Sequence, residues 1–234
     1  MSTFESQKKR RELNAKLIKF TLIIAAVISI LTTFGILFSI LFEAIEFFKL
    51  RSFWYFLTGT VWSPGVTNSE FGALPIFAGT FVITIIALAV AIPIGLGSAI
   101  YMSEYASGKV RDYLKPLLEI LAGIPTVVYG FFAAVTVAPF VVKVANFFGI
   151  EATFNSALAS GIVMGIMIIP LVSSLSDDVI RAVPDSQRKA AFGLGMTHGE
   201  TIKNIVLPSA MPGIISASLL ALSRALGETM IVVM

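Results

Sequence analysis

Residues 71–103 read FGALPIFAGTFVITIIALAVAIPIGLGSAIYMS, and no Asp, Glu, Lys or Arg interrupts them. A helix crosses the roughly 30 Å hydrocarbon core of a bilayer with about 20 apolar residues. Within lipid, every backbone N–H and C=O must find its partner inside its own segment, which a helix provides. The run therefore predicts a helix that spans a membrane.

The composition of the whole chain fits the same environment. It is 56% hydrophobic and 13% charged, with a mean hydropathy of +0.90, whereas a soluble domain carries about 25% charged residues. The absence of cysteine excludes disulfides and thiolate metal sites, and a single histidine cannot form a metal cluster. We expect no cofactor and no catalytic residue. The net charge of +3 is better explained by membrane topology than by nucleic acid.

Five hydrophobic runs predict an all-α, polytopic membrane helical bundle. The first run is too long for the apolar region of a signal peptide, so we expect it to be retained as a span. The predicted spans are about 17–42, 74–103, 116–142, 155–176 and 211–234, which together form a transmembrane domain over 17–234.

Lys and Arg are distributed unevenly over the segments that connect these spans. They gather in the tail 1–16, in 109–115 and in the loop 177–208. The alternate segments contain only Lys49, Arg51 and Lys143. Because cytoplasmic segments carry the excess of positive charge, the N-terminal tail and the loop 177–208 are predicted to be cytoplasmic.

Two further segments have structural interpretations. The outward segment 43–73 is dense in aromatic residues, which favours an anchoring belt at the bilayer interface over a ligand-binding loop. Small residues at Ala157, Gly161 and Gly165 predict a face for close helix packing. No glycine-rich sequence matches the phosphate-binding loop of ATPases, so this chain is not expected to hydrolyse ATP and is not expected to be an enzyme.

The loop 177–208 predicts two short helices. The first begins at Asp185, and glycines after Ala191 break it. Thr197 and Glu200 then have the spacing of a capping box, in which each side chain bonds the backbone N–H of the other. Pro208 is expected to end the second helix.

The same loop carries a family resemblance. Lys189-Ala190-Ala191-x-x-x-Gly195, followed by Ile205-x-Leu207-Pro208, resembles the EAA loop of binding-protein-dependent ABC permeases. Lys189 departs from that pattern, which usually has Glu. The resemblance implies an ABC importer type I transmembrane domain whose loop docks into an ATPase subunit. The implied coupling residues are Lys189, Ala190, Ala191, Gly195, Thr197, Glu200, Ile205, Leu207 and Pro208.

Two charges fall inside the last predicted span. Arg224 and Glu228 are four residues apart, which on a helix places both on one face, about 6 Å apart. A charge at bilayer depth costs about 3 kcal/mol on insertion scales, so we expect the pair to have a function, with a structural ion pair as the alternative. A guanidinium offers a planar fork of donors suited to an oxyanion.

Three runs resemble phosphate-specific permeases, and the last resembles the C-type permease. They are IPIGLG with YMSEY in 92–105, GIPTVVYGFF in 123–132 and RALGETM in 224–230. The resemblance implies a phosphate pathway lined by Arg224, Glu228, Thr126 and Tyr129.

The family resemblance also implies the partners and the location of the chain. It implies a homologous second permease, two ATP-binding subunits and an extracytoplasmic phosphate-binding protein, in a bacterial inner membrane. Such permeases usually have six spans, so the chain is expected to be truncated before its last span. The alternatives are a permease for another oxyanion, such as sulfate or molybdate, and a channel or membrane scaffold that is not coupled to ATP.

Overall fold

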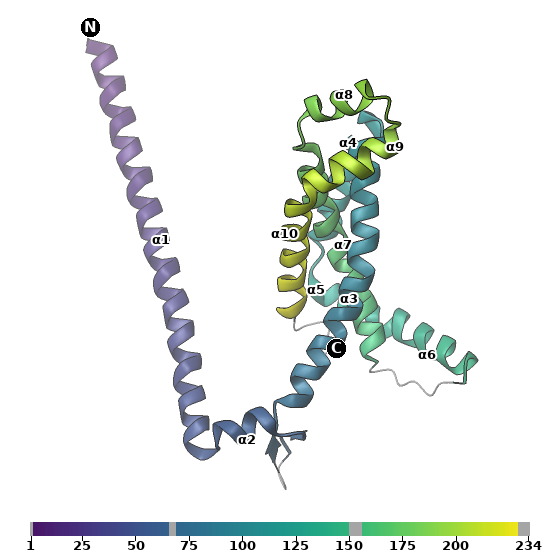
Figure 1. Cartoon of the computed structure of the whole chain (residues 1–234). Coiled ribbons are helices and arrows are strands. Elements are labelled where there is room, and N and C mark those ends of the chain that lie inside the picture. Colours follow the sequence, from purple (N-terminus) through teal and green to yellow (C-terminus); the bar gives the residue numbers. More distant parts are fainter. Residues whose placement is uncertain (1, 66–68, 150–155, 229–234) are drawn as a thin grey trace. The chain divides into compact units, whose positions relative to one another are not determined.

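The computed structural model describes residues 2–65, 69–149 and 156–228, with side chains from Asn14 onward. Figure 1 shows the order of the elements along the chain. Five helices are long and apolar enough to cross a membrane, at 14–50, 74–105, 126–147, 157–181 and 198–226. The predicted all-α membrane fold with five spans is therefore confirmed over the described residues. The chain divides into two compact units, Met1–Leu74 and Pro75–Met234.

The first unit consists of a long helix and a small folded segment. Helix α1 runs over Ser2–Leu50, beyond the predicted limit of residue 42. A short helix α2 (Phe53–Thr58) follows, and then strands β1 (Trp62–Ser63) and β2 (Glu70–Phe71) pair antiparallel. Aromatic side chains join these pieces, since the ring of Phe47 lies 5.7 Å from that of Phe56 and 5.7 Å from that of Phe71.

A close backbone approach holds this segment together. A Cβ built on Gly72 would overlap the carbonyl atoms of Gly59, so neither position has room for a side chain. The Gly72 N–H donates to the Val61 carbonyl at 2.8 Å. The aromatic segment after α1 is thus folded on itself.

In the second unit, α3 (Leu74–Ile100) continues into a π-helical turn, η1 (Tyr101–Tyr105), and packs against α7 (Ala157–Arg181). Glycines set the separation of these two helices. A Cβ on Gly161 would lie 2.7 Å from the Ile86 side chain, and one on Gly165 would lie 2.8 Å from the Val90 side chain. The predicted small-residue packing face is confirmed, and α3 is the helix that it contacts.

The third span is interrupted where the sequence predicted a continuous helix. Helix α4 covers Gly108–Ala122, and the span itself begins with α5 (Thr126–Phe132) and continues through η2 (Ala133–Val137) into α6 (Ala138–Phe147). The predicted start at residue 116 therefore differs from the observed one. Pro125 disfavours the helical conformation at Ile124 and is itself extended, with ψ 137°, so the helix breaks there.

The last span begins earlier than predicted. Helix α9 (His198–Thr201), a π-helical turn η3 (Ile202–Val206) and α10 (Leu207–Leu226) follow one another without a break. The prediction that Pro208 ends the second helix of the loop is wrong. Pro208 lies directly after the π turn, and such a local π turn is one of the adjustments by which a spanning helix accommodates a proline.

Small side chains fill the interior of this unit. One buried cluster joins α3, α7 and α10 through Ala87, Ala91, Ala221 and Ala225, which pack with Met164 and Ile168 among others. A second cluster joins Ala99, Ile180, Val206 and Ala210. Alanine at these contacts lets the helices approach closely. Because the hydrophobic effect does not drive helix association within lipid, membrane helices are stabilised by such close van der Waals packing.

Candidate functional site

The loop after α7 folds into two short helices, which we call the knob (residues 185–201). Helix α8 (Asp185–Gly193) ends in a Schellman motif: the Met196 N–H donates to the Ala191 carbonyl at 3.2 Å, and the Gly195 N–H donates to the Phe192 carbonyl at 3.0 Å. Gly195 has φ +82°, in the left-handed region that favours glycine. The predicted glycine break is therefore a tight reversal between α8 and α9.

The predicted capping box at the start of α9 is confirmed. The Thr197 hydroxyl accepts from the Glu200 backbone N–H, and the Glu200 carboxylate accepts from the Thr197 N–H at 2.8 Å. Two backbone donors at the helix start are satisfied by these bonds. The box fixes the direction in which α9 leaves the reversal at Gly195.

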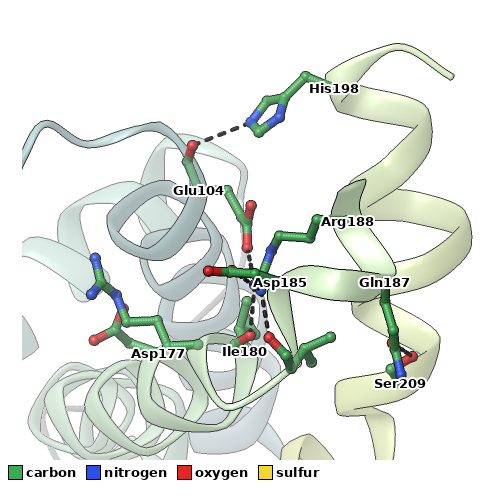
Figure 2. Close-up of polar contacts among 10 residues, drawn as sticks. Glu104, Asp177, Ile180, Asp185, Gln187, Arg188, His198 and Ser209 are labelled. Carbon is green, nitrogen blue, oxygen red and sulfur yellow. Dashed lines mark hydrogen bonds and ion pairs between the residues drawn. The ribbon is translucent and has the colours of Figure 1, made fainter. Parts of the chain in front are cut away.

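Arg188 joins the knob to the rest of the unit, as Figure 2 shows. Its guanidinium bonds the Glu104 carboxylate of η1 at 2.8 Å, and the exposed fractions of the two side chains are 16% and 6%. The same group donates to the carbonyls of Ile180 at 3.0 Å and Val183 at 2.5 Å, at the end of α7. One side chain thus connects η1, α7 and α8.

A second buried ion pair lies on the neighbouring turns of α7. Arg111 of α4 bonds Asp177 at 2.7 Å, and the Asp177 side chain is wholly buried. The hydrogen bond to Asp177 raises the pKa of Arg111 above its already high usual range, against the opposing effect of desolvation. Lys115 and Asp178 form a parallel pair at 2.6 Å, but the Asp178 side chain is more than half exposed. Helix α4 is therefore tied to α7 by charge.

The single histidine packs between two aromatic rings. His198 of α9 meets the Tyr105 ring edge to face at 5.2 Å and stacks on Phe192 of α8 at 6.2 Å. Its Nε2 lies 3.2 Å from the Glu104 carbonyl, which accepts a hydrogen bond when Nε2 carries the proton. The His198 ring therefore connects α9 to η1 and to α8.

Two large apolar side chains of the knob are exposed among its polar residues. The exposed fractions are 84% for Leu194 and 46% for Phe192. Among the predicted coupling residues, Lys189 and Ala190 are exposed while Ala191 is buried. The apolar surface at the reversal is suited to a protein partner.

The remaining predicted coupling residues lie around this surface or support it. Gly195, Thr197, Glu200 and Pro208 are exposed, and Ile205 and Leu207 are half-buried along the helix that follows the knob.

The predicted pathway residues lie at the other end of α10. At 1.5 Å per residue, Arg224 is about 25 Å from Pro208 along the helix. Arg224 is exposed, and the next residue, Ala225, belongs to the buried cluster against which Tyr129 packs. The Tyr129 hydroxyl donates to the Leu121 carbonyl at 2.9 Å, across the break between α4 and α5. Thr126 is half-buried as the first residue of α5.

The prediction that Arg224 and Glu228 share one face of a continuous helix is wrong. Helix α10 ends at Leu226 with Gly227 as its cap, and Glu228 lies beyond it. The Glu228 N–H donates to the Ala225 carbonyl at 3.3 Å, which turns the chain after the last helical turn. The two residues therefore do not share an α-helical face.

Sequence reasoning missed the ion pairs that hold the knob. Arg188 stands beside Lys189 in a polar helix, and nothing in its position distinguishes a buried arginine from an exposed one. Glu104 directly follows an uncharged run, and nothing in its neighbours indicates a partner. Asp177 offered one signal, because a carboxylate that continues the apolar face of a spanning helix must find a cation.

Comparison with known proteins agrees with this architecture. Residues 91–234 match the family model described as "Binding-protein-dependent transport system inner membrane component". The probable ABC transporter permease protein YqgH of Bacillus subtilis is 37% identical over 76% of this chain and 57% of its own length. The phosphate transport system permease protein PstC 1 of Mycobacterium tuberculosis is 34% identical over 90% of this chain and 71% of its own length.

Other relatives differ mainly in how much of their length is matched. A phosphate transport system permease protein PstC of Mesorhizobium japonicum is 34% identical over 76% of this chain and 58% of its own length. The chain thus spans little more than half the length of several of these relatives. A solved chain of the MetNI methionine ABC transporter has a TM-score of 0.51 at 19% identity, covers 67% of this chain and 68% of its own, and is similar in fold.

Proposed function

The chain belongs to the family of binding-protein-dependent transport system inner membrane components, and on that premise we propose that it is a pathway-forming permease subunit of an ATP-driven phosphate importer. It is a multi-pass membrane protein and a transport subunit rather than an enzyme. Relatives named as phosphate permeases support phosphate over sulfate or molybdate as the substrate.

The observation that carries the proposal is the knob. A loop that served only to connect two spans would have no reason to hold exposed apolar residues on a rigid support. Leu194 and Phe192 are exposed at the turn between α8 and α9. The Arg188 side chain bonds this part of the chain to η1 and α7. This arrangement suits docking into a cleft of an ATP-binding subunit, which would hydrolyse the ATP.

The other expected partners follow from the same proposal. A homologous second permease would complete the pathway, a second ATP-binding subunit would pair with the first, and an extracytoplasmic binding protein would deliver phosphate. The knob would then face the cytoplasm, together with the basic N-terminal tail, in agreement with the distribution of Lys and Arg.

Arg224 is the proposed anion contact in the pathway. Its guanidinium is charged at every relevant pH and matches the geometry of a tetrahedral oxyanion. It adjoins Ala225, whose buried cluster packs against Tyr129, and the Tyr129 hydroxyl donates to the Leu121 carbonyl across the break between α4 and α5. Broken helices occur in membranes where they are buried in protein or line a cavity, which supports a pathway at this place.

The test is phosphate uptake by cells that express Arg224→Ala or Arg224→Lys at normal levels. Loss of one charge-assisted contact of about 1.5–3 kcal/mol predicts a fall in uptake of roughly ten- to a hundredfold for Arg224→Ala. Arg224→Lys should recover part of it, because an ammonium keeps the charge but not the fork. Lys143→Ala, at an exposed position on α6, is the control. Full uptake in both Arg224 variants would refute the role of this residue.

A further inference from the structure

Two consecutive residues of η1 receive contacts from the knob. Glu104 bonds Arg188 of α8 at 2.8 Å through its carboxylate, and its carbonyl lies 3.2 Å from the His198 ring of α9. Tyr105 meets the same His198 ring edge to face at 5.2 Å. The knob therefore contacts the end of α3 from both of its helices, as Figure 2 shows for Glu104, Arg188 and His198.

We propose that Glu104 and Tyr105 form a clamp on the knob, so that movement of the knob is passed directly to the spanning helix α3. Arg188 and His198 are the positioning residues on the knob side. This inference rests on the proposed function, because it assumes that an ATP-binding subunit moves the knob. It goes beyond that function by naming the helix that receives the movement and the side chains that pass it on.

The chemistry of Arg188 makes the clamp stiff. Its guanidinium is planar and serves four acceptors at once: the carboxylates of Glu104 and Asp185 and the carbonyls of Ile180 and Val183. An arginine fork has the donors for such an arrangement, whereas a lysine ammonium is a single point charge on a flexible stem. Because the Glu104 side chain is almost wholly buried, separating it from Arg188 would leave a buried charge without its partner.

The position of η1 allows a movement of the knob to displace α3. Tyr101–Tyr105 continues α3 with no break in the helix, so a displacement of Glu104 displaces the end of the span. Ala99, one turn earlier, is buried against Ile180 and Val206, which adjoin the knob on either side. Packed interfaces shift between discrete arrangements rather than deform continuously.

The first test uses the assembled transporter in proteoliposomes, with phosphate uptake and ATP hydrolysis measured on the same preparation. Arg188→Met and Glu104→Gln should each assemble and hydrolyse ATP, while the phosphate moved per ATP falls by roughly 5- to 150-fold, the range typical of coupling between sites. Arg188→Lys should fall less than Arg188→Met. Lys115→Met, which breaks a pair of similar length at an exposed position, should leave the ratio unchanged.

A merely structural role for Arg188 would lower uptake and ATP hydrolysis together and leave their ratio unaltered. An unchanged ratio in both Arg188→Met and Glu104→Gln would overturn the clamp.

A second test does not depend on whether Arg188→Met and Glu104→Gln fold normally. The sequence has no cysteine, so within this chain a reducible bis-methanethiosulfonate linker can join only the pair in a Tyr105→Cys, His198→Cys protein. A clamp whose two sides move together predicts that linking restores the uptake lost by the substitutions, and that reduction removes the gain. If linking instead lowers uptake below that of the reduced protein, the two sides must move apart and the proposal is wrong.

Failure of the proposed function would look different. If the unsubstituted transporter moves no phosphate, the substrate assignment fails. The clamp is then tested by ATP hydrolysis alone. In Arg188→Met, ATP hydrolysis should no longer depend on the extracytoplasmic binding protein, because the knob is no longer coupled to the spanning helices. Hydrolysis that keeps the dependence of the unsubstituted transporter would overturn the clamp on its own.

Discussion

Asp177 and Asp178 are adjacent carboxylates on α7 with ion pairs of nearly equal length, which makes them a matched pair for measuring what burial contributes. Arg111 lies 2.7 Å from Asp177, and Lys115 lies 2.6 Å from Asp178. The Asp177 side chain is wholly buried, whereas the Asp178 side chain is 56% exposed. Replacing each by Asn keeps the size of the side chain and removes its charge.

The expected losses of stability differ several-fold. Removing one partner of a buried ion pair costs about 3–5 kcal/mol, because the other charge is left uncompensated. Arg111 keeps 19% exposure of its side chain, so solvent offsets part of this loss and about 3 kcal/mol is expected for Asp177→Asn. The exposed pair contributes about 0–1 kcal/mol. At about 2–4 °C per kcal/mol for a chain of this size, Tm should fall by about 6–12 °C for Asp177→Asn.

The assay is thermal unfolding of the purified transporter in one detergent, at one protein concentration and one scan rate. Asp178→Asn should lower Tm by no more than about 4 °C. Arg181, whose Nε lies 3.6 Å from Asp177, gives a further check, since Arg181→Gln should have an effect between the two. Equal shifts for Asp177→Asn and Asp178→Asn would refute the argument that burial of this pair ties α4 to α7.

Three other predictions follow from single contacts. Gly95→Ala should lower stability by about 1–3 kcal/mol, because its Cβ would lie 2.8 Å from the Val172 side chain. Gly97→Ala should be neutral or stabilising, because a Cβ there would have nothing within 4 Å. Thermal unfolding compares the two variants, and equal effects would contradict the close packing at Gly95. Thr197→Ala removes the capping box of α9 and should cost about 1 kcal/mol, measurable as faster amide exchange in α9. Leu194→Ser should reduce co-purification of the ATP-binding subunit, since it removes the most exposed apolar side chain of the knob. Its Tm should fall by no more than about 2 °C. Unchanged co-purification would show that the ATP-binding subunit docks elsewhere.

Much of the fold could be predicted because lipid imposes simple requirements. Uncharged runs predicted the spans, and small residues at Gly161 and Gly165 predicted a packed face. Local chemistry predicted the reversal at Gly195 and the capping box at Thr197. Each of these features depends on residues close together in the sequence, so no knowledge of the tertiary fold was needed.

The errors arose where proline and glycine acted together with their surroundings. Pro125 breaks a helix in a run that is continuous by hydropathy. The break was not predicted because hydropathy does not include the restriction that a proline places on the backbone of the residue before it. Pro208 had the opposite outcome, since the π turn before it let the helix continue. Gly227 ended α10 before Glu228, so a spacing of four residues did not produce a shared helical face.

The ion pairs that hold the knob depend on contacts between distant positions. Arg188 and Glu104 are separated by 84 positions in the sequence, and neither has a neighbour that reveals the other. Family resemblance located the knob but gave no information on what lies beneath it. The supporting side chains were found only from the structure.

The most direct test of the whole account is uptake of labelled phosphate into proteoliposomes that contain this chain, its second permease and two ATP-binding subunits, with binding protein supplied. The account predicts uptake that requires ATP hydrolysis, persists in excess sulfate or molybdate, and is lost in Arg224→Ala. Phosphate flux that proceeds without ATP, or that excess sulfate abolishes, would contradict it.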